Sequence, residues 1–407
     1  MTVSPVRPTP PAFGWADPFF TFGVTGTNGK TSTVHLIAAV LAASGHEPLR
    51  ISTVDYRLGE LDLKLPHTRK GFFDAFEAAR DAGAQWAAVE VTSRALADHY
   101  AKRWRFDLGV FTNLSPDHLS THGTYEAYLA AKAQLFVHLG PGRTAVLNAA
   151  DEHSLFIDQA TPPDVNRCWF GSPTRGPMLR DADLRAAAVE VDAAGTRVRL
   201  EPSPMADALG GTLQTRLVGA VFAENALAAA AATLSAGMPA DAVRRGIASC
   251  APVAGRFEVL AQDPVAVVDY AHTPDALERT CAQARALAKG RLLVVFGAGG
   301  GASPDKRVPM GEAVGAHADV VYVTNDNPRD EAPEAIAEAL VTGLRASNAR
   351  VEVELDRAEA IRRAMADAQP DDVVVVAGKG HEQGQTQAGV TRPFCDRSEV
   401  LRWTPSR

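Results

Sequence analysis

The sequence predicts an α/β protein with two domains, each built on a mostly parallel β-sheet. The chain has 407 residues, which suits two or three domains of roughly 100–200 residues each. Short apolar, Val-rich runs alternate with helix-length segments, as in βαβ units. This pattern starts near Phe19 and begins again near Pro252, so the chain is expected to divide at about residue 251.

The first domain opens with a β-prone run at 19–25 (FFTFGVT) that leads into a glycine-rich turn. A long apolar segment from Thr31 predicts a buried helix that ends at Gly45. Further strands are expected at 86–91, 108–112 and 144–148, with helices at 72–82 and 124–137. Alternating polarity over 185–218 predicts a small antiparallel patch, and an Ala-rich run predicts a helix at 224–236.

The second domain repeats the alternation with more uniformly apolar strands. They are expected at 265–268, 292–296, 320–323, 351–355 and 373–376. Continuous Val-rich runs are typical of parallel strands that are buried on both faces. The predicted organisation is a Pro-rich tail (1–18), a P-loop ATPase domain with the antiparallel patch (19–251) and a Rossmann-like α/β domain (252–407).

The composition excludes several classes of protein. With 41 Lys and Arg against 48 Asp and Glu, the net charge is −7, which gives no general attraction to nucleic acid or anionic membranes. No apolar run approaches the ~20 residues of a membrane span, and the N-terminus has no signal-peptide core. Four scattered cysteines match neither a zinc ribbon nor a disulfide framework. These features predict a cytoplasmic protein.

The strongest motif is Gly23-Val-Thr-Gly-Thr-Asn-Gly-Lys-Thr31, which lies between a strand and a helix. In such a turn the backbone N–H groups and the helix N-terminus attract phosphate, Lys30 adds charge, and Thr31 offers a hydroxyl to Mg²⁺. The spacing differs from the general P-loop, because the first glycine comes one residue early. An ordinary glycine-rich turn is the alternative, but it does not explain Lys-Thr at the start of the helix.

Candidate metal ligands follow two strands of the first domain. Glu90 ends one strand, and His118 lies just beyond another, at the sheet edge where open α/β proteins place their sites. A carboxylate suits Mg²⁺ better than imidazole does, and a surface carboxylate and a capping histidine are the alternatives. Lys132 lies in an apolar helix, and the residues alone favour a lysine whose ammonium reaches solvent.

The strands of the second domain also end in polar motifs. Asp269 and His272 follow one strand and are candidates for binding or proton transfer. The motifs DNPR (326–329) and GKGHE (378–382) follow two others, and turn chemistry is the alternative for both. Residues 297–302 match a dinucleotide-binding fingerprint, but Pro304 and Pro309 break the helix that should follow. We therefore do not expect NAD.

Together these segments resemble the Mur ligases, which form amide bonds at the expense of ATP. The matching segments, in the family's order, are TGTNGKT (25–31), VEVTS (89–93), FTNLSPDHL (111–119), YLAAK (128–132), GRFE (255–258), DYAHTPDAL (269–277), DNPR and GKGHE. The most similar branch adds the third residue of the stem peptide to UDP-N-acetylmuramoyl-L-alanyl-D-glutamate.

The resemblance implies a role for each matching residue. The implied catalytic residues are Lys30, Lys132, Asp269 and His272. The implied ATP-binding residues are Gly26, Thr27, Asn28, Gly29, Lys30, Thr31, Asn113, Asn225 and Arg256. The implied amino-acid-binding residues are Arg307, Asn327, Arg329, Gly378 and Glu382, and the implied metal ligands are Thr31, Glu90, His118 and Lys132. Lys132 matches a lysine that the family carbamylates.

Several positions depart from the family pattern, mostly on the side of the acyl donor. Thr92-Ser93-Arg94 replaces Ser-Ser-His, residues 65–68 replace a Thr-Thr-Pro motif, and Phe222 replaces an asparagine. The loop 301–304 lacks the family's charges. The family's UDP-binding N-terminal domain is also expected to be absent, because the glycine-rich motif begins at Gly23. We therefore expect a donor other than the UDP-linked one.

The predicted activity is an ATP-dependent carboxylate–amine ligase that works through an acyl phosphate. The cofactors are ATP and Mg²⁺, with two ions, and the partners are a small-molecule or peptide donor and a diaminopimelate-like amino acid. Neither nucleic acid nor membrane insertion is expected, and the oligomeric state stays open. Two alternatives remain, namely a non-catalytic ATP-binding subunit and an amidating partner of a glutaminase.

Overall fold

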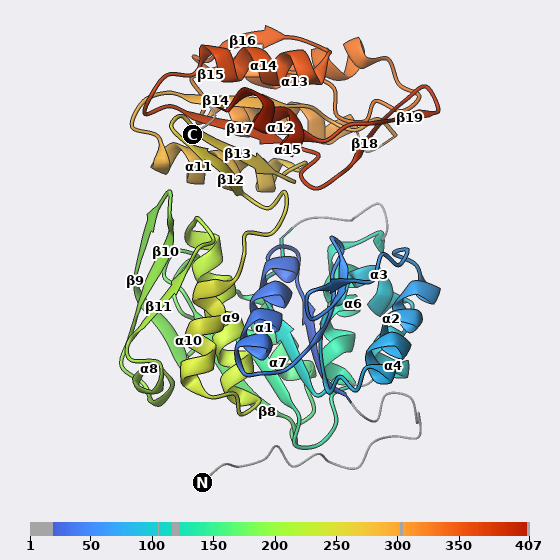
Figure 1. Cartoon of the computed structure of the whole chain (residues 1–407), viewed down its shortest axis with the longest axis vertical. Helices are drawn as coiled ribbons and strands as arrows, with labels where there is room; N and C mark the ends of the chain where they lie inside the picture. The colour runs from blue at the N-terminus through green and yellow to red at the C-terminus, as the bar shows by residue number, and fades with distance from the viewer. Residues whose placement is uncertain (1–18, 105, 116–121, 302–303, 405–407) are drawn as a thin grey trace. The chain divides into compact units, whose positions relative to one another are not determined.

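The computed structural model describes residues 19–104, 106–115, 122–301 and 304–404. Within it the chain forms two compact units, of which the first ends at Ala251 and the second begins at Pro252. Figure 1 shows that each unit is a sheet accompanied by helices. Among the described helices, none joins the length and the hydropathy that a bilayer crossing requires.

The first unit contains one 11-stranded sheet in the order β11-β10-β9-β8-β7-β6-β1-β5-β2-β3-β4. Its parallel centre consists of β1 (Phe20–Thr25), β2 (Leu49–Ile51), β5 (Trp86–Glu90), β6 (Leu108–Phe111), β7 (Thr144–Asn148) and β8 (Asn166–Gly171). One edge carries β3 (Tyr56–Leu58) and β4 (Leu61–Asp62), and the other carries β9 (Leu184–Asp192), β10 (Gly195–Leu200) and β11 (Thr212–Thr215). The predicted antiparallel patch therefore extends the main sheet rather than standing apart from it.

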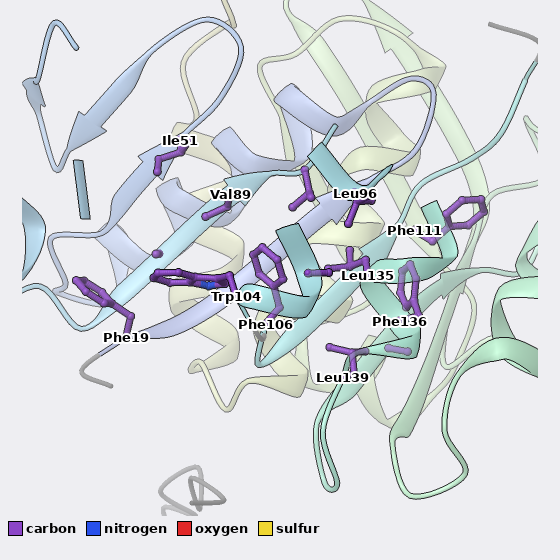
Figure 2. Packing of buried hydrophobic residues seen from close by; sticks show 14 of the residues in the cluster. Phe19, Ile51, Val89, Leu96, Trp104, Phe106, Phe111, Leu135, Phe136 and Leu139 are labelled. Carbon is purple, nitrogen blue, oxygen red and sulfur yellow. The ribbon is translucent and has the colours of Figure 1, made fainter. Parts of the chain in front are cut away.

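Two groups of helices accompany this sheet. The first group is α1 (Lys30–Ala43), α9 (Ala220–Ser235) and α10 (Ala240–Ser249), which lie against one another. The second is α2 (Arg69–Asp81), α3 (Ser93–Ala97), α4 (Tyr100–Arg103), α6 (Tyr125–Val137) and α7 (His153–Ala160), and α8 (Pro204–Ala208) follows β10. Figure 2 shows part of the core, in which Val89, Trp104, Phe106, Leu135 and Phe136 belong to one cluster of buried residues.

The second unit contains a six-stranded sheet in the order β12-β13-β17-β14-β15-β16. Its strands are β12 (Glu258–Gln262), β13 (Val265–Asp269), β14 (Leu292–Phe296), β15 (Val320–Val323), β16 (Arg350–Val353) and β17 (Val373–Ala377). All neighbours are parallel except β12 and β13. The helices are α11 (Pro274–Leu287), a 3₁₀ turn η1 (Pro304–Lys306), α12 (Arg307–Gly315), α13 (Pro333–Leu344), α14 (Arg357–Asp367) and α15 (Asp396–Trp403). A hairpin of β18 (Gly384–Gln387) and β19 (Val390–Pro393) follows β17.

Parallel strands β13, β14, β15 and β17 end at one edge of this sheet, and the polar motifs begin there. Asp269 is the last residue of β13, and Gly378 directly follows β17. The central strands are completely buried, as the Val-rich runs predict. The topology therefore brings DNPR and GKGHE to the same edge.

Candidate functional site

The glycine-rich loop between β1 and α1 is fixed by the loop that follows β6. The carbonyl oxygen of Asn113 accepts a hydrogen bond from Thr27 N at 2.8 Å. The side chain of Asn113 accepts from Asn28 N at 3.0 Å and donates to the carbonyl oxygen of Asn28 at 3.0 Å. Thr112 Oγ1 also donates to this carbonyl, at 2.7 Å. The conformation of the loop is thus set before any phosphate binds.

Two glycines of this loop have no room for a side chain. Gly26 has φ 151°, and a Cβ there would collide with Thr112 Oγ1. Gly29 has φ 84° at the N-cap of α1, and its Cβ would collide with the side-chain oxygen of Asn225. A left-handed residue directly before a helix aims the first N–H groups of that helix outward. Asn225, which the sequence places 196 residues away, therefore lies against the loop.

Lys30, Thr31 and Glu90 meet at the start of α1. Lys30 Nζ donates to the carbonyl oxygen of Thr27 at 2.9 Å and lies 3.9 Å from Glu90 Oε1. Thr31 Oγ1 donates to Glu90 Oε2 at 2.8 Å. The backbone N–H and hydroxyl of Thr53 donate to the same oxygen, at 3.1 Å and 3.2 Å. A carboxylate, a hydroxyl and a cation therefore converge beside the N-terminus of the helix.

Lys132 is buried, so the interpretation of this residue as a lysine whose ammonium reaches solvent is wrong. It is 1% exposed, and its Nζ donates to the carbonyl oxygen of Gly26 at 2.6 Å. The same ammonium lies 4.3 Å from the centre of the Tyr128 ring. The helix α6 thus directs Lys132 toward the glycine-rich loop. His118 lies outside the described residues.

A histidine–serine pair lies beside Lys132, and sequence reasoning did not single it out. His122 Nε2 is 3.0 Å from Ser93 Oγ, and the His122 ring lies 5.2 Å from that of Tyr128. Burial, aided by the charge of Lys132, lowers the pKa of His122. Ser93 belongs to the Thr92-Ser93-Arg94 departure. Within this structure its hydroxyl has His122 as a partner.

In the second unit, the ring of Tyr270 lies beside one arginine and two histidine side chains. The Arg256 guanidinium lies 4.6 Å from the centre of its ring, within the range of a cation–π contact. The rings of His272 and His381 lie 4.6 Å and 5.1 Å away. Nε of Arg256 is buried without a hydrogen-bond partner among the described residues, which leaves this group available for a ligand.

Asp269 and His272 differ in how their polar atoms are used. The Asp269 carboxylate accepts from Phe257 N at 2.7 Å, Ala271 N at 2.9 Å and Thr280 Oγ1 at 2.9 Å. These bonds fix the GRFE turn and the start of the loop after β13. His272 Nδ1 lies 2.7 Å from the carbonyl oxygen of Tyr270, so Nδ1 carries the hydrogen and Nε2 is the acceptor in the neutral ring.

DNPR and GKGHE form one cluster, which we call the acceptor cluster: Asp326, Asn327, Lys379 and Glu382. Asn327 Nδ2 donates to Glu382 Oε2 at 2.8 Å, and Lys379 Nζ donates to the same oxygen at 2.9 Å. Lys379 also donates to Asn327 Oδ1 at 3.1 Å and lies 3.7 Å from Asp326 Oδ1. Its side chain is completely buried. The cluster therefore joins a completely buried lysine, Lys379, to the partly exposed carboxylate of Glu382.

The electrostatics of the two acids in this cluster differ in sign. Burial alone would raise the pKa of Glu382, but hydrogen bonds from Lys379 and Asn327 outweigh it, and this pKa lies below its ordinary value. Burial raises the pKa of Asp326, despite the attraction of Arg357 and Lys379. Glu382 is thus the carboxylate that stays ionised as the pH falls.

The remaining predicted amino-acid-binding residues lie around this cluster. Arg307 is 5% exposed and donates to Glu331 Oε2 at 2.8 Å, while Gly301 N donates to Glu331 Oε1 at 2.6 Å. Arg329 has φ 54°, and its backbone N–H donates to the carbonyl oxygen of Thr386 at 3.0 Å. Gly378 has φ 120°, and a Cβ there would lie 2.7 Å from Asp326 Oδ2.

Comparison with known proteins places both units in one family. The Mur ligase middle domain matches residues 24–233, and the Mur ligase glutamate ligase domain matches residues 255–380. The chain belongs to the Mur ligase family. It is an ATP-dependent ligase that joins an acid to an amino acid, as the motifs indicate.

The similar Mur ligases are named for one activity. The UDP-N-acetylmuramoyl-L-alanyl-D-glutamate–2,6-diaminopimelate ligase of Solibacter usitatus is 40% identical over 390 residues, covering 93% of this chain and 76% of that protein. The enzyme of the same name from Aquifex aeolicus is 37% identical over 385 residues, with the same coverage. The chain is therefore most similar to the branch that the sequence motifs indicated.

Solved structures agree with this assignment. A UDP-N-acetylmuramoyl-L-alanyl-D-glutamate–2,6-diaminopimelate ligase has a TM-score of 0.68 at 32% identity, covering 95% of this chain and 78% of that one. E. coli FolC in complex with DHPP and ADP has a TM-score of 0.69 at 23% identity, covering 90% and 87%. The second likeness concerns the fold alone.

Mur ligases use ATP and Mg²⁺, and the residues at the start of α1 suit both. Oxygen ligands are those that Mg²⁺ prefers, and it keeps several waters and nucleotide phosphates as further ligands. Thr31 and Glu90 supply such oxygens. Across the described residues, no three His, Cys, Asp or Glu side chains group as a metal site.

Proposed function

We propose that this Mur ligase joins an amino acid of the diaminopimelate type to the D-glutamyl carboxylate of a muramyl dipeptide donor. The single observation that carries the proposal is the meeting of Lys30, Thr31 and Glu90 at the N-terminus of α1. The 40% identity to a diaminopimelate-adding relative supports the choice of substrates. The acceptor cluster supplies the carboxylate that an ammonium group requires.

On the first unit, we assign the phosphates of ATP to the glycine-rich loop. The remaining backbone N–H groups of the loop at Gly26 and Gly29–Thr31, the α1 N-terminus and Lys30 Nζ would hold the phosphate oxygens, where positive potential is concentrated. The N–H groups of Thr27 and Asn28 are directed to Asn113 instead. Asn113 and Asn225 would keep this loop in shape, as their contacts with Asn28 and Gly29 suggest. Arg256, on the second unit, is assigned to the nucleotide as well, because its buried Nε is available.

For the metal, we propose two Mg²⁺ ions with Thr31, Glu90, His118 and Lys132 as ligands from the chain. Bound Mg²⁺ offsets charge on the phosphoryl group being transferred. Lys132 would serve as a carbamate, formed when its neutral amine adds to CO₂ and loses a proton. The direction of Nζ toward the glycine-rich loop, shown by its hydrogen bond to Gly26, supports this assignment.

The chemistry that we propose has two steps. A carboxylate oxygen of the donor attacks the γ-phosphorus, and ADP leaves, so that an acyl phosphate forms. The amine then attacks the acyl carbon, phosphate leaves, and the nitrogen loses a proton. Phosphate is a far better leaving group than the oxide of a carboxylate, and charge positioning dominates such transfers. Lys30 would stabilise the charge on the transferring group.

His272 is our candidate for the group that takes the proton from the amine. Its Nδ1 is directed to the carbonyl oxygen of Tyr270, which leaves Nε2 as the acceptor. Asp269 would contribute by position, since its carboxylate fixes the loop that carries His272. The motifs imply a catalytic role for both residues. We assign the proton transfer to His272 and a positioning role to Asp269.

The amino acid is assigned to the acceptor cluster and its neighbours. Glu382 would pair with an ammonium group, and Asn327 would hold Glu382 in place. Arg307 and Arg329 would bind a carboxylate, the geometry for which a planar guanidinium is suited. Gly378 would offer backbone atoms, because a side chain there is excluded by Asp326.

The choice of donor follows the similar proteins. The similar proteins are named for a UDP-linked dipeptide, and no comparison supports the expectation of another donor. That expectation rested on the sequence alone, namely on the expected absence of the family's N-terminal domain and on the departures at Thr92–Arg94, 65–68 and Phe222. The UDP-linked dipeptide is therefore our first choice, and the same dipeptide without the nucleotide is the second.

The test is a phosphate-release assay with both donors, each with diaminopimelate, lysine or no amino acid. We expect release that depends on donor and diaminopimelate together, with a product whose mass equals donor plus amino acid minus water. Equal rates with lysine and diaminopimelate would contradict the assigned acceptor. Release with neither donor would contradict the assigned carboxylate.

A further inference from the structure

A pair of completely buried charges lies behind the acceptor cluster. The side chains of Arg357 on α14 and Asp396 on α15 are both 0% exposed. Arg357 Nε donates to Asp396 Oδ1 and Nη2 donates to Asp396 Oδ2, each at 2.7 Å. Two parallel bonds of this kind fix the plane of a guanidinium group. Neither residue belongs to the motifs assigned to a substrate.

The rest of the Arg357 guanidinium reaches the ends of two strands. Nη1 donates to the carbonyl oxygen of Asn325 at 3.2 Å, and Nη2 donates to that of Ala377 at 2.9 Å. Asn325 lies directly before DNPR, and Ala377 lies directly before GKGHE. One side chain therefore holds the backbone where both motifs begin.

The same guanidinium continues into the acceptor cluster through Asp326. The charge of Arg357 acts on Asp326, and Asp326 in turn lies 3.7 Å from Lys379. Gly378 makes this approach possible, because its missing Cβ would lie 2.7 Å from Asp326 Oδ2 and 3.9 Å from Arg357 Nη2. Charges thus alternate in sign along a row of five residues: Asp396, Arg357, Asp326, Lys379 and Glu382.

We propose that Arg357 and Asp396 are positioning residues for the amino-acid substrate, and that they act through Asp326 and Lys379 on Glu382. This inference rests on the proposed function of the acceptor cluster. A buried ion pair offers little net stability, because desolvation offsets the attraction. What a planar fork adds is direction, since it orients two carbonyl groups and one carboxylate at once. The contribution of this pair is therefore the geometry of the two motifs.

The test compares variants in the full-length enzyme. Arg357→Lys keeps the charge and loses the fork, while the double variant Arg357→Met/Asp396→Leu removes both charges and leaves no buried ion unpaired. Glu399→Gln is the control, because Glu399 lies on α15, the helix that carries Asp396, and pairs with the exposed Arg402. Steady-state kinetics would give KM for diaminopimelate and KM for ATP. Amide hydrogen exchange would follow residues 325–329 and 378–382 without any substrate.

Both altered enzymes are expected to show about tenfold or higher KM for diaminopimelate, since small misplacements are costly in a site of fixed geometry. KM for ATP should stay within about twofold, and exchange should accelerate in both motif segments but not over residues 26–31. The control should match the wild type. A lower melting temperature with unchanged KM and unchanged exchange in both segments would overturn the inference.

Failure of the proposed function would look different. A wild-type enzyme that ignores diaminopimelate would refute the proposed substrate, whereas hydrogen exchange in the two motif segments would still decide whether Arg357 and Asp396 position them. Faster exchange in both motif segments of the double variant would uphold the positioning role. Unchanged exchange there would reject it.

Discussion

The hydroxyl of Thr31 lies 2.8 Å from Oε2 of Glu90 and joins the first turn of α1 to the end of β5. Thr53 donates twice to the same oxygen, so the Glu90 carboxylate is held from two sides. Lys30 lies 3.9 Å from its other oxygen. The start of the helix and the end of the strand therefore present one preformed group to a phosphate and its cation.

Replacing Lys30 by alanine should abolish most turnover. The ammonium is the charge closest to the proposed phosphate site, and losing one such group typically costs about 100-fold or more in rate. Phosphate release under saturating substrates would measure the loss. The exposed Lys70, which pairs with Asp74 on α2, is the control, and Lys70→Ala should leave the rate unchanged. An undiminished rate in Lys30→Ala would refute the assigned role.

Glu90→Gln should shift the requirement for Mg²⁺. Glutamine keeps the shape but removes the negative charge, and it brings two N–H donors near Thr31 and Thr53. We expect the Mg²⁺ concentration for half-maximal activity to rise about tenfold, a usual loss when a group that holds a metal is altered. A Mg²⁺ titration of ligase activity measures it. The same half-maximal concentration in wild type and variant would argue against Glu90 as a ligand.

Two glycines with nearly the same backbone conformation provide a matched pair. Gly29 has φ 84° and Gly45 has φ 86°, but a Cβ meets Asn225 only at Gly29 and finds open space at Gly45. Gly45→Ala should cost about 1 kcal/mol of stability from backbone strain alone and keep ATP binding. Gly29→Ala should lose ATP binding as well. Calorimetric titration and thermal unfolding of both variants would separate the two effects.

The pH dependence of amino-acid binding should be set by Lys379. With Lys379 and His381 nearby, the pKa of Glu382 lies below its ordinary value, so Glu382 stays ionised through the neutral range. Its contribution to stability is present above the pKa of an unfolded glutamate and is lost as the pH falls through the lower folded value. Lys379→Met removes both the hydrogen bond and the charge of Lys379, so burial is opposed only by Asn327 and His381 and the pKa of Glu382 rises. KM for the amino acid, measured against pH, should therefore begin to rise at higher pH in this variant.

Lys379→Arg is the control for that experiment, because it keeps a positive charge beside Glu382. Its KM profile should resemble that of the wild type in shape, even if the larger group reduces the rate. Profiles of identical shape in Lys379→Met and wild type would mean that Lys379 does not set the charge of Glu382.

Strands and their glycine-rich turns could be predicted from the sequence because their signals are local. The run 144–148 and the Val-rich run 292–296 appear as β7 and β14 with the same limits. Helix α1 begins at Lys30, directly after the left-handed Gly29, as a Lys-Thr pair after glycine indicates. Seven of the described strands were not predicted, namely β2, β3, β4, β8, β12, β18 and β19. Of these, β3, β4, β18 and β19 are short and little buried.

Side-chain partners were harder to predict, because they depend on residues far apart in the chain. Nothing local in α14 indicates that Arg357 pairs with Asp396, 39 positions later. Lys132 resembled a surface lysine, yet the topology directs it to Gly26. Lys379 stood within a recognised motif without an assigned role, and only the fold shows that it joins Asn327 to Glu382.

The most direct test of the ATP site is a crystal structure of the protein grown with a non-hydrolysable ATP analogue and Mg²⁺. We predict that the β- and γ-phosphates contact the backbone N–H groups of 29–31 and Lys30 Nζ, with Mg²⁺ beside Thr31 and Glu90. A nucleotide bound elsewhere, with this loop unchanged and Lys30 directed to Thr27 and Glu90 as in this structure, would contradict the account.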